Sequence, residues 1–134
     1  MFSLKFLIIF LILILSVHAL ATVKFWYWTV WWFDIPMHFL GGIWVAAVFF
    51  WLRNQFQEVR PPRGSTSQIL IVISCLSFVA LIGVLWEFAE FLFDFFISSK
   101  GYEEIVRQKA ADTLADLFFG LLGGLTAAFI FLIR

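Results

Sequence analysis

The sequence predicts an all-α protein, a polytopic bundle of four transmembrane helices. Of its 134 residues, 63% are hydrophobic and 13% are charged, whereas about 25% of a typical soluble domain is charged. The mean hydropathy is +1.02. The apolar residues fall into four runs, of which the second, third and fourth meet the requirement of roughly 20 residues for a spanning helix. We expect residues 1–134 to form a single transmembrane domain.

The first expected helix covers residues 4–22. Lys5, the apolar stretch after it and the small residues around Ala19 and Ala21 also have the form of a signal peptide with its cleavage site. Two interpretations of residues 1–21 stay open, a retained helix and a cleaved signal-peptide-like segment. The topology that follows is the same in both cases, because the next segment emerges on the far side of the membrane.

An aromatic segment follows, with seven aromatic residues in the nine positions from Phe25 to Phe33. Aromatic rings concentrate at the head-group level of a bilayer, so this segment is typical of a membrane interface. The alternative is a platform for a lipid head group or a sugar beside a polar site.

The other three helices are expected at about 35–53, 68–97 and 111–133, with loops between them. In the loop that ends at Gln68, Pro61-Pro62 breaks any helix. Basic residues are retained on the cytoplasmic side of membranes. Alternating spans divide the nine basic residues five to four, which favours cytoplasmic N- and C-termini by a small margin.

Six of the nine acidic residues lie within or at the ends of these helices: Asp34, Glu87, Glu90, Asp94, Asp112 and Asp116. An ionised group at the bilayer centre costs roughly 2.5–3.5 kcal/mol, so these side chains must face one another, water or a cation. Spacings of three, four and seven residues place the acids of each helix on one stripe, with His38 beside Asp34. Alternating spans bring the three stripes into the same leaflet, whichever way the chain is inserted.

Each acid also has a simpler interpretation. Asp34 and Asp112 suit the first turn of a helix, where a carboxylate meets the positive end of the helix dipole. Asp94 suits an interfacial position that reaches water. Apolar sequence flanks Glu87 and Asp116 on both sides, as it does Glu90, and this favours a functional or ion-binding role for these three acids.

Oxygen ligands with one imidazole suit a divalent metal, Mg²⁺, Mn²⁺ or Zn²⁺. We expect the metal ligands to be His38, Glu87, Glu90 and Asp116, and the catalytic residues to be Asp34 and Asp112. The alternative is a metal-free cluster in which several carboxyl groups are protonated, as in proton relays.

Three further kinds of residue have structural interpretations. His18 is expected at the interface without carboxylates nearby, and the lone Cys75 is expected as a small packing residue. Helix packing is the expected role of the glycines around the acids, namely Gly41, Gly42, Gly83, Gly120, Gly123 and Gly124.

Three motifs occur in order: Phe33-Asp34-x3-His38-Phe39-x-Gly41-Gly42, Trp86-Glu87-x2-Glu90 and Asp112-Thr113-x2-Asp116-x6-Gly123-Gly124. Together they resemble the VanZ-like superfamily of bacterial integral membrane proteins, nearest its uncharacterised YjdF-type branch. The resemblance implies a multi-pass protein of the bacterial cell membrane with a polar intramembrane cluster. Glu90 and Asp116 stand where the better-known VanZ form has Gln and Asn, so this cluster is more acidic.

We expect a metal-dependent site that acts on a lipid or a lipid-linked component of the cell envelope. The alternatives are a proton- or ion-coupled carrier, which four short helices would form as a homo-oligomer, and a non-catalytic accessory protein. Membrane lipids are the expected partners. The zero net charge does not indicate a nucleic-acid partner.

Overall fold

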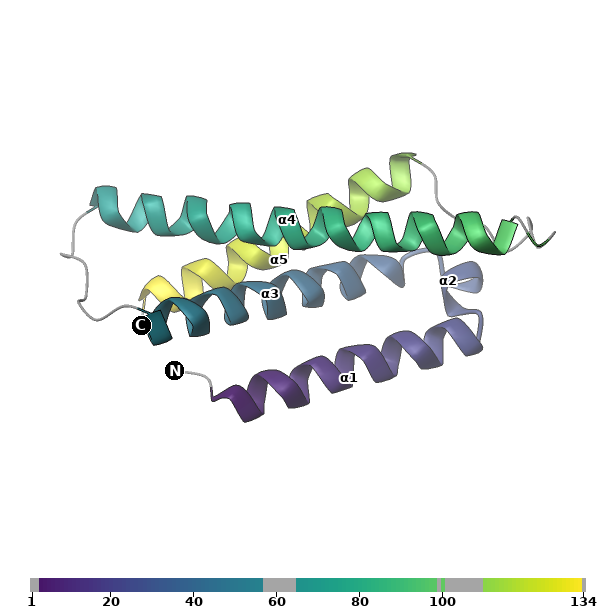
Figure 1. The fold of residues 1–134 in the computed structure, drawn as a ribbon, viewed down its shortest axis with the longest axis horizontal. Helices are drawn as coiled ribbons and strands as arrows, with labels where there is room; N and C mark the ends of the chain where they lie inside the picture. The colour runs from purple at the N-terminus through teal and green to yellow at the C-terminus, as the bar shows by residue number, and fades with distance from the viewer. Residues whose placement is uncertain (1–2, 57–64, 99, 101–109, 134) are drawn as a thin grey trace.

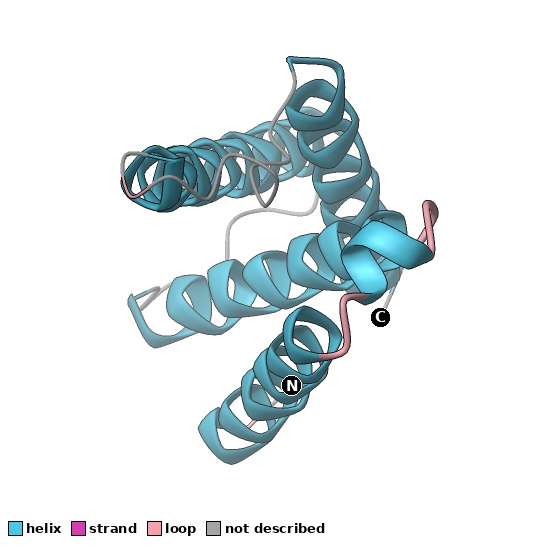
Figure 2. Ribbon diagram, turned by 90° about the vertical axis from the view of Figure 1, so that its right-hand side faces the viewer, coloured by secondary structure: helices cyan, strands magenta, loops and turns pink. Residues whose placement is uncertain are grey.

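In a computed structural model of the chain, residues 3–56, 65–98, 100 and 110–133 are described. Their helices are α1 (Leu4–Val23), α2 (Trp26–Thr29), α3 (Asp34–Phe56), α4 (Ser65–Ser98) and α5 (Ala110–Ile133). The expected all-α fold is confirmed, since the described residues form no strand (Figure 2). The four longer helices are each long and apolar enough to cross a membrane.

The four long helices alternate in direction, as the sequence predicts (Figure 1). The N- and C-termini lie at one end of the bundle. At the opposite end, α1 finishes, α3 begins, α4 finishes and α5 begins, with α2 beside them. This arrangement brings the three acidic stripes to one end of the molecule.

Helix ends differ from the expected ones by three residues at most. The largest differences are at the end of α3, which continues to Phe56, and at the start of α4, where Ser65 to Ser67 are helical although we expected a loop. Hydropathy marks the limits of the hydrocarbon layer, whereas backbone hydrogen bonding can extend a helix past them. The expected helix break at Pro61-Pro62 lies outside the described residues.

The aromatic segment is folded back onto the bundle. Phe25 has φ 58° and ψ 28°, a left-handed conformation that is uncommon for a residue with a side chain. This turn ends α1 and starts α2, and it packs Tyr27 with Ala21 and Met37 in a small core. The segment is therefore not only an interfacial belt, because Tyr27 is buried.

Helices α3 and α5 form the most extensive contact in the bundle, and glycines allow it. A Cβ added at Gly42 would overlap the backbone carbonyl of Gly120, and one at Gly123 would overlap the carbonyl of Phe39. A Cβ at Gly124 would lie 2.8 Å from Cγ2 of Val79 on α4. The expected packing role is confirmed for these close approaches, because only glycine lets the backbones meet.

Gly41 is an exception to the expected packing role. A Cβ added there would have no heavy atom within 4 Å, so the expectation was wrong at this position. Gly41 lines a cavity described below, whereas the next residue, Gly42, makes the contact with α5.

The main core lies between α3, α4 and α5. It contains Val45, Ala46, Cys75, Val79, Ala127 and Ala128. Cys75 is fully buried there, which confirms its packing role. Helix α1 packs along α3, where the Trp44 indole nitrogen donates a hydrogen bond of 2.8 Å to the carbonyl oxygen of Leu7.

The outer surface of the bundle is apolar. Large side chains such as Leu13, Ile69 and Phe118 are 58%, 58% and 60% exposed, as expected of helices that face lipid. Helix α4 has 34 residues, so at about 1.5 Å per residue it is about 51 Å long. A hydrocarbon core is only about 30 Å thick.

The glycine contacts lead to a stability prediction. We expect Gly42→Ala to lower the free energy of unfolding by about 1–3 kcal/mol, because its methyl group collides with the Gly120 backbone. Gly41→Ala is the matched control, and we expect it to be neutral or to stabilise the helix by up to about 1 kcal/mol. Thermal unfolding in detergent compares the two, and equal transition temperatures would contradict the described packing.

Candidate functional site

The predicted convergence of acidic stripes is present in the structure. Asp34 and His38 lie in the first turns of α3, Asp116 lies near the start of α5, and Glu87 and Glu90 lie on α4. Their side chains line one cavity. The prediction required only four alternating spans, and this is why it holds without knowledge of the orientation in the membrane.

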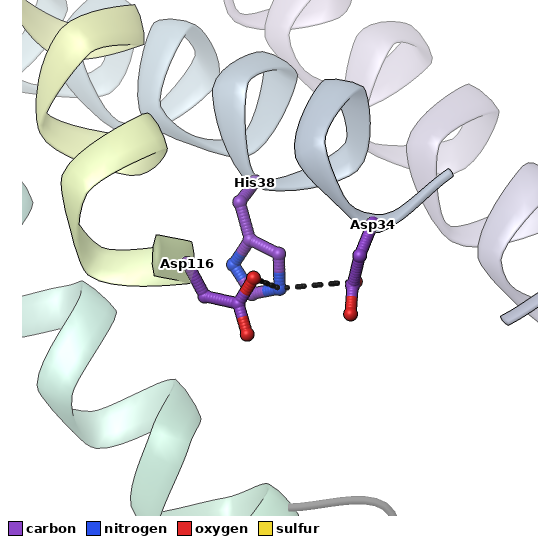
Figure 3. A group of neighbouring side chains, drawn as sticks. All are labelled: Asp34, His38 and Asp116. Carbon is purple, nitrogen blue, oxygen red and sulfur yellow. Dashed lines mark ion pairs between the residues drawn. The ribbon is translucent and has the colours of Figure 1, made fainter. Parts of the chain in front are cut away.

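His38 is the centre of the cluster (Figure 3). Its Nε2 lies 3.3 Å from Oδ1 of Asp34 and 3.6 Å from Oδ1 of Asp116. Asp34 is one helical turn away on α3, so its position follows from the helix itself. Asp116 comes from α5. The close contact between Gly42 and Gly120 places it beside the imidazole ring of His38.

Helix α4 supplies the other two carboxylates. Glu87 is only 6% exposed, and Asp116 across from it is 7% exposed. Glu90 lies one turn further along α4, where its Oε1 accepts a hydrogen bond of 2.9 Å from the Trp86 indole nitrogen. This bond restrains the Glu90 side chain at the margin of the cluster.

Two overlapping sets of side chains have the composition of metal sites. Asp34, His38 and Asp116 form one set, and His38, Glu87 and Glu90 form the other. In each set one ligand atom per residue lies within 4.8 Å of the others. Ligands of a tetrahedral ion at about 2.0–2.1 Å are about 3.3 Å apart, so the two distances around His38 suit a small divalent cation.

The predicted ligands His38, Glu87, Glu90 and Asp116 all belong to these sets. Asp34, which we expected to be catalytic and not a ligand, also belongs to one of them. Asp112 lies in the exposed first turn of α5, outside both sets. Asp94 and Asp112 instead line a second cavity at the end of the bundle.

Two cavities meet at the cluster. The inner cavity has a volume of about 210 Å³ and extends from the acids and His38 between α1, α3, α4 and α5. The outer cavity is larger, about 520 Å³, and is lined by aromatic and acidic side chains. None of the lysines and arginines in the described part of the chain lines either cavity, so the surroundings of the cluster are acidic.

Three side chains at this site were not among the predicted metal or catalytic residues, namely His18, Tyr27 and Trp86. His18 lines both cavities, and its Nδ1 lies 2.6 Å from the hydroxyl of Tyr27. Its ring also contacts the Trp86 ring edge-on, with centroids 5.7 Å apart. The expectation that no carboxylates lie near His18 was wrong, because Asp34, Glu90 and Asp116 line the same two cavities. The topology that brings Asp34 to this leaflet applies equally to His18, which lies near the end of α1. The same reasoning could therefore have predicted His18 at the site.

The bond between Tyr27 and His18 can be tested directly. Tyr27→Phe keeps the buried ring but removes the hydroxyl, and we expect it to cost about 1–2 kcal/mol in unfolding free energy, because a polar group of His18 loses its partner. Thr29→Val is the control, since the Thr29 hydroxyl donates only to a carbonyl in its own exposed turn. Thermal unfolding should separate the two variants, and equal losses would contradict a special role for the Tyr27 hydroxyl.

Comparison with known proteins identifies the family. Neither a curated protein nor a solved structure matches the chain. A family model described as a predicted membrane protein, DUF2238, matches residues 2–134, and this agrees with the four apolar helices. Because the match covers nearly the whole chain, the protein belongs to the DUF2238 family of predicted membrane proteins.

Proposed function

We propose that this membrane protein binds a divalent cation at the His38 cluster and acts there on a lipid or lipid-linked substrate. The observation that carries the proposal is the convergence of one imidazole and four carboxylates from three helices, within the distances given above. A cation would be attracted to this concentration of carboxylates, and no lysine or arginine in the described part of the chain lines either cavity.

The surroundings support a lipid as the substrate. The inner cavity begins at the cluster and continues between Leu11, Ile14 and Val79, which are apolar side chains of membrane-spanning helices. A water-soluble substrate would leave this part of the cavity unused. An amphipathic molecule matches both parts, because its polar group reaches the cluster while its chain occupies the apolar part.

The proposed reaction is hydrolysis or transfer at a phosphate or glycosyl bond. His38, Glu87, Glu90 and Asp116 would hold the cation, which when bound would polarise an oxygen of the substrate. Asp34, whose Oδ1 lies 3.3 Å from the His38 Nε2, would act as the base that accepts a proton. Asp112, on the wall of the outer cavity, would orient the polar part of the substrate.

The proposal includes a location. The VanZ-like resemblance supports the bacterial cell membrane, and the distribution of basic residues supports cytoplasmic N- and C-termini. The site is at the end of the bundle opposite both termini (Figure 1). It would then serve the extracytoplasmic leaflet, either in a single chain or in a homo-oligomer.

Elemental analysis tests the metal. We expect purified protein, reloaded with Mg²⁺, Mn²⁺ or Zn²⁺, to hold a stoichiometric ion. Glu87→Gln/Asp116→Asn should weaken binding at least about 100-fold, beyond the effect of losing an outer-shell partner. Asp94→Asn/Asp112→Asn is the matched control, because it also removes two carboxylates from this end of the bundle but leaves both ligand sets intact.

Two outcomes would overturn the proposal. If no ion binds after reloading, and proteoliposomes show a proton flux that Glu90→Gln abolishes, the cluster is a proton relay in a carrier. If neither metal nor flux is found, and the Glu87→Gln/Asp116→Asn protein keeps full cellular activity, the cluster has only a structural role in an accessory protein.

A further inference from the structure

The inner and outer cavities adjoin each other. Six residues line both of them and form what we call the neck: His18, Tyr27, Asp34, Trp86, Glu90 and Asp116. His38 lies at the neck, beside Asp34 and Asp116. A ligand that passes through the neck therefore contacts the proposed metal site with its middle part, and its two ends lie in different surroundings.

The inner cavity runs toward the middle of the membrane. Its wall includes Leu11 of α1 and Leu121 of α5, which lie seven residues from His18 and five residues from Asp116. At about 1.5 Å per residue these side chains are roughly 10 Å and 8 Å deeper than the neck. Space remains at Gly41, where a Cβ would touch nothing. This shape suits the first carbons of a lipid chain that lies along the bilayer normal.

The outer cavity has the composition of a site for an organic cation. Aromatic rings of Phe25, Trp28 and Phe93 line it together with the carboxylates of Asp94 and Asp112. Aromatic faces and carboxylates both attract ammonium groups. An anionic head group would be repelled by these acids. No lysine or arginine in the described part of the chain lines the outer cavity to attract it.

We propose that the lipid is a zwitterionic phospholipid whose ammonium group occupies the outer cavity, with its phosphate at the neck and the start of a chain in the inner cavity. This inference rests on the proposed function for the phosphate, which the cation at His38 would bind. The ammonium group and the chain depend only on the two cavities. The charges of the lipid and of the protein would match in order. The phosphate would lie at the proposed cation, and the ammonium group would lie beside the acidic and aromatic wall of the outer cavity.

The orientation also agrees with the surrounding bilayer. The outer cavity lies at the end of the bundle, where α1 finishes and α5 begins, and the inner cavity lies between the spans. A lipid of the adjacent leaflet would enter with its head group already at the outer level. It would need neither to invert nor to leave the membrane.

The test measures which lipid the protein retains. The purified full chain in detergent is offered an equal mixture of phosphatidylethanolamine and phosphatidylglycerol with identical acyl chains, and bound lipid is quantified by mass spectrometry. We expect about tenfold enrichment of the ethanolamine lipid. The enrichment should persist in a chelator, because the ammonium group is recognised away from the metal. Equal retention of both lipids would overturn the proposal.

Two variants separate head group from chain. Asp94→Asn/Asp112→Asn should abolish the enrichment while metal binding stays intact, so failure of this inference is distinguishable from failure of the proposed function. Gly41→Leu should displace both lipids by filling the inner cavity, whereas Leu81→Phe, at an exposed position on α4, should not. Thermal unfolding and metal content show that each variant is folded.

Competition with a free amine, ethanolamine, is the last experiment. Ethanolamine lacks the chain, so we expect it to compete with the lipid only at concentrations at least about a hundredfold higher. Competition by ethanolamine at the same concentration as the lipid would overturn the assignment to a lipid. Unchanged enrichment in Asp94→Asn/Asp112→Asn would overturn the assignment of the ammonium group to the outer cavity.

Discussion

The backbone contact between α3 and α5 is the constraint on which the site depends. Gly42 meets the carbonyl of Gly120, and Gly123 meets that of Phe39, so no larger residue can stand at these points without moving a helix. Lipid gives helices no hydrophobic reason to associate, and close packing of small residues is what holds them together. Asp116 lies one turn before Gly120, and the same contact therefore sets its distance from His38. The glycine contacts between α3 and α5 therefore determine both the helix packing and the geometry of the site.

The second constraint is the burial of two of the acids. Glu87 and Asp116 are nearly inaccessible, and no lysine or arginine in the described part of the chain lines either cavity. Trp86 donates to Glu90, and His38 lies between two aspartates. The Trp86 indole orients Glu90 without adding a charge. The metal-dependent and the proton-coupled hypotheses both require such a cluster to bind a positive ligand, either an ion or a proton.

The length of the apolar runs was enough to predict four spans and the leaflet that collects the acids, because a bilayer forces the backbone to cross as complete helices. Depth within the leaflet was harder to predict. Asp112 and Asp116 share a stripe, yet only Asp116 contacts His38. The position of α5 along the axis of α3 is fixed by the glycine contact, and the stripe alone does not predict it. His18 was missed for another reason. Its partner Tyr27 comes into place through the left-handed turn at Phe25, where no glycine marks the turn in the sequence.

The unequal lengths of the helices have a consequence for the surrounding bilayer. The apolar part of α4, Thr66–Phe96, has 31 residues and is about 46 Å long at 1.5 Å per residue, whereas α1 has 20 residues and spans about 30 Å. To fit α4 into a core of about 30 Å by tilting alone would require an angle of about 50°, beyond the usual 0–40°. The bilayer must therefore thicken beside α4, or the exposed phenylalanines at its end must enter the head-group layer. Hydrophobic mismatch would then be concentrated beside the outer cavity, and membrane thickness would influence how lipids arrange themselves at its entrance.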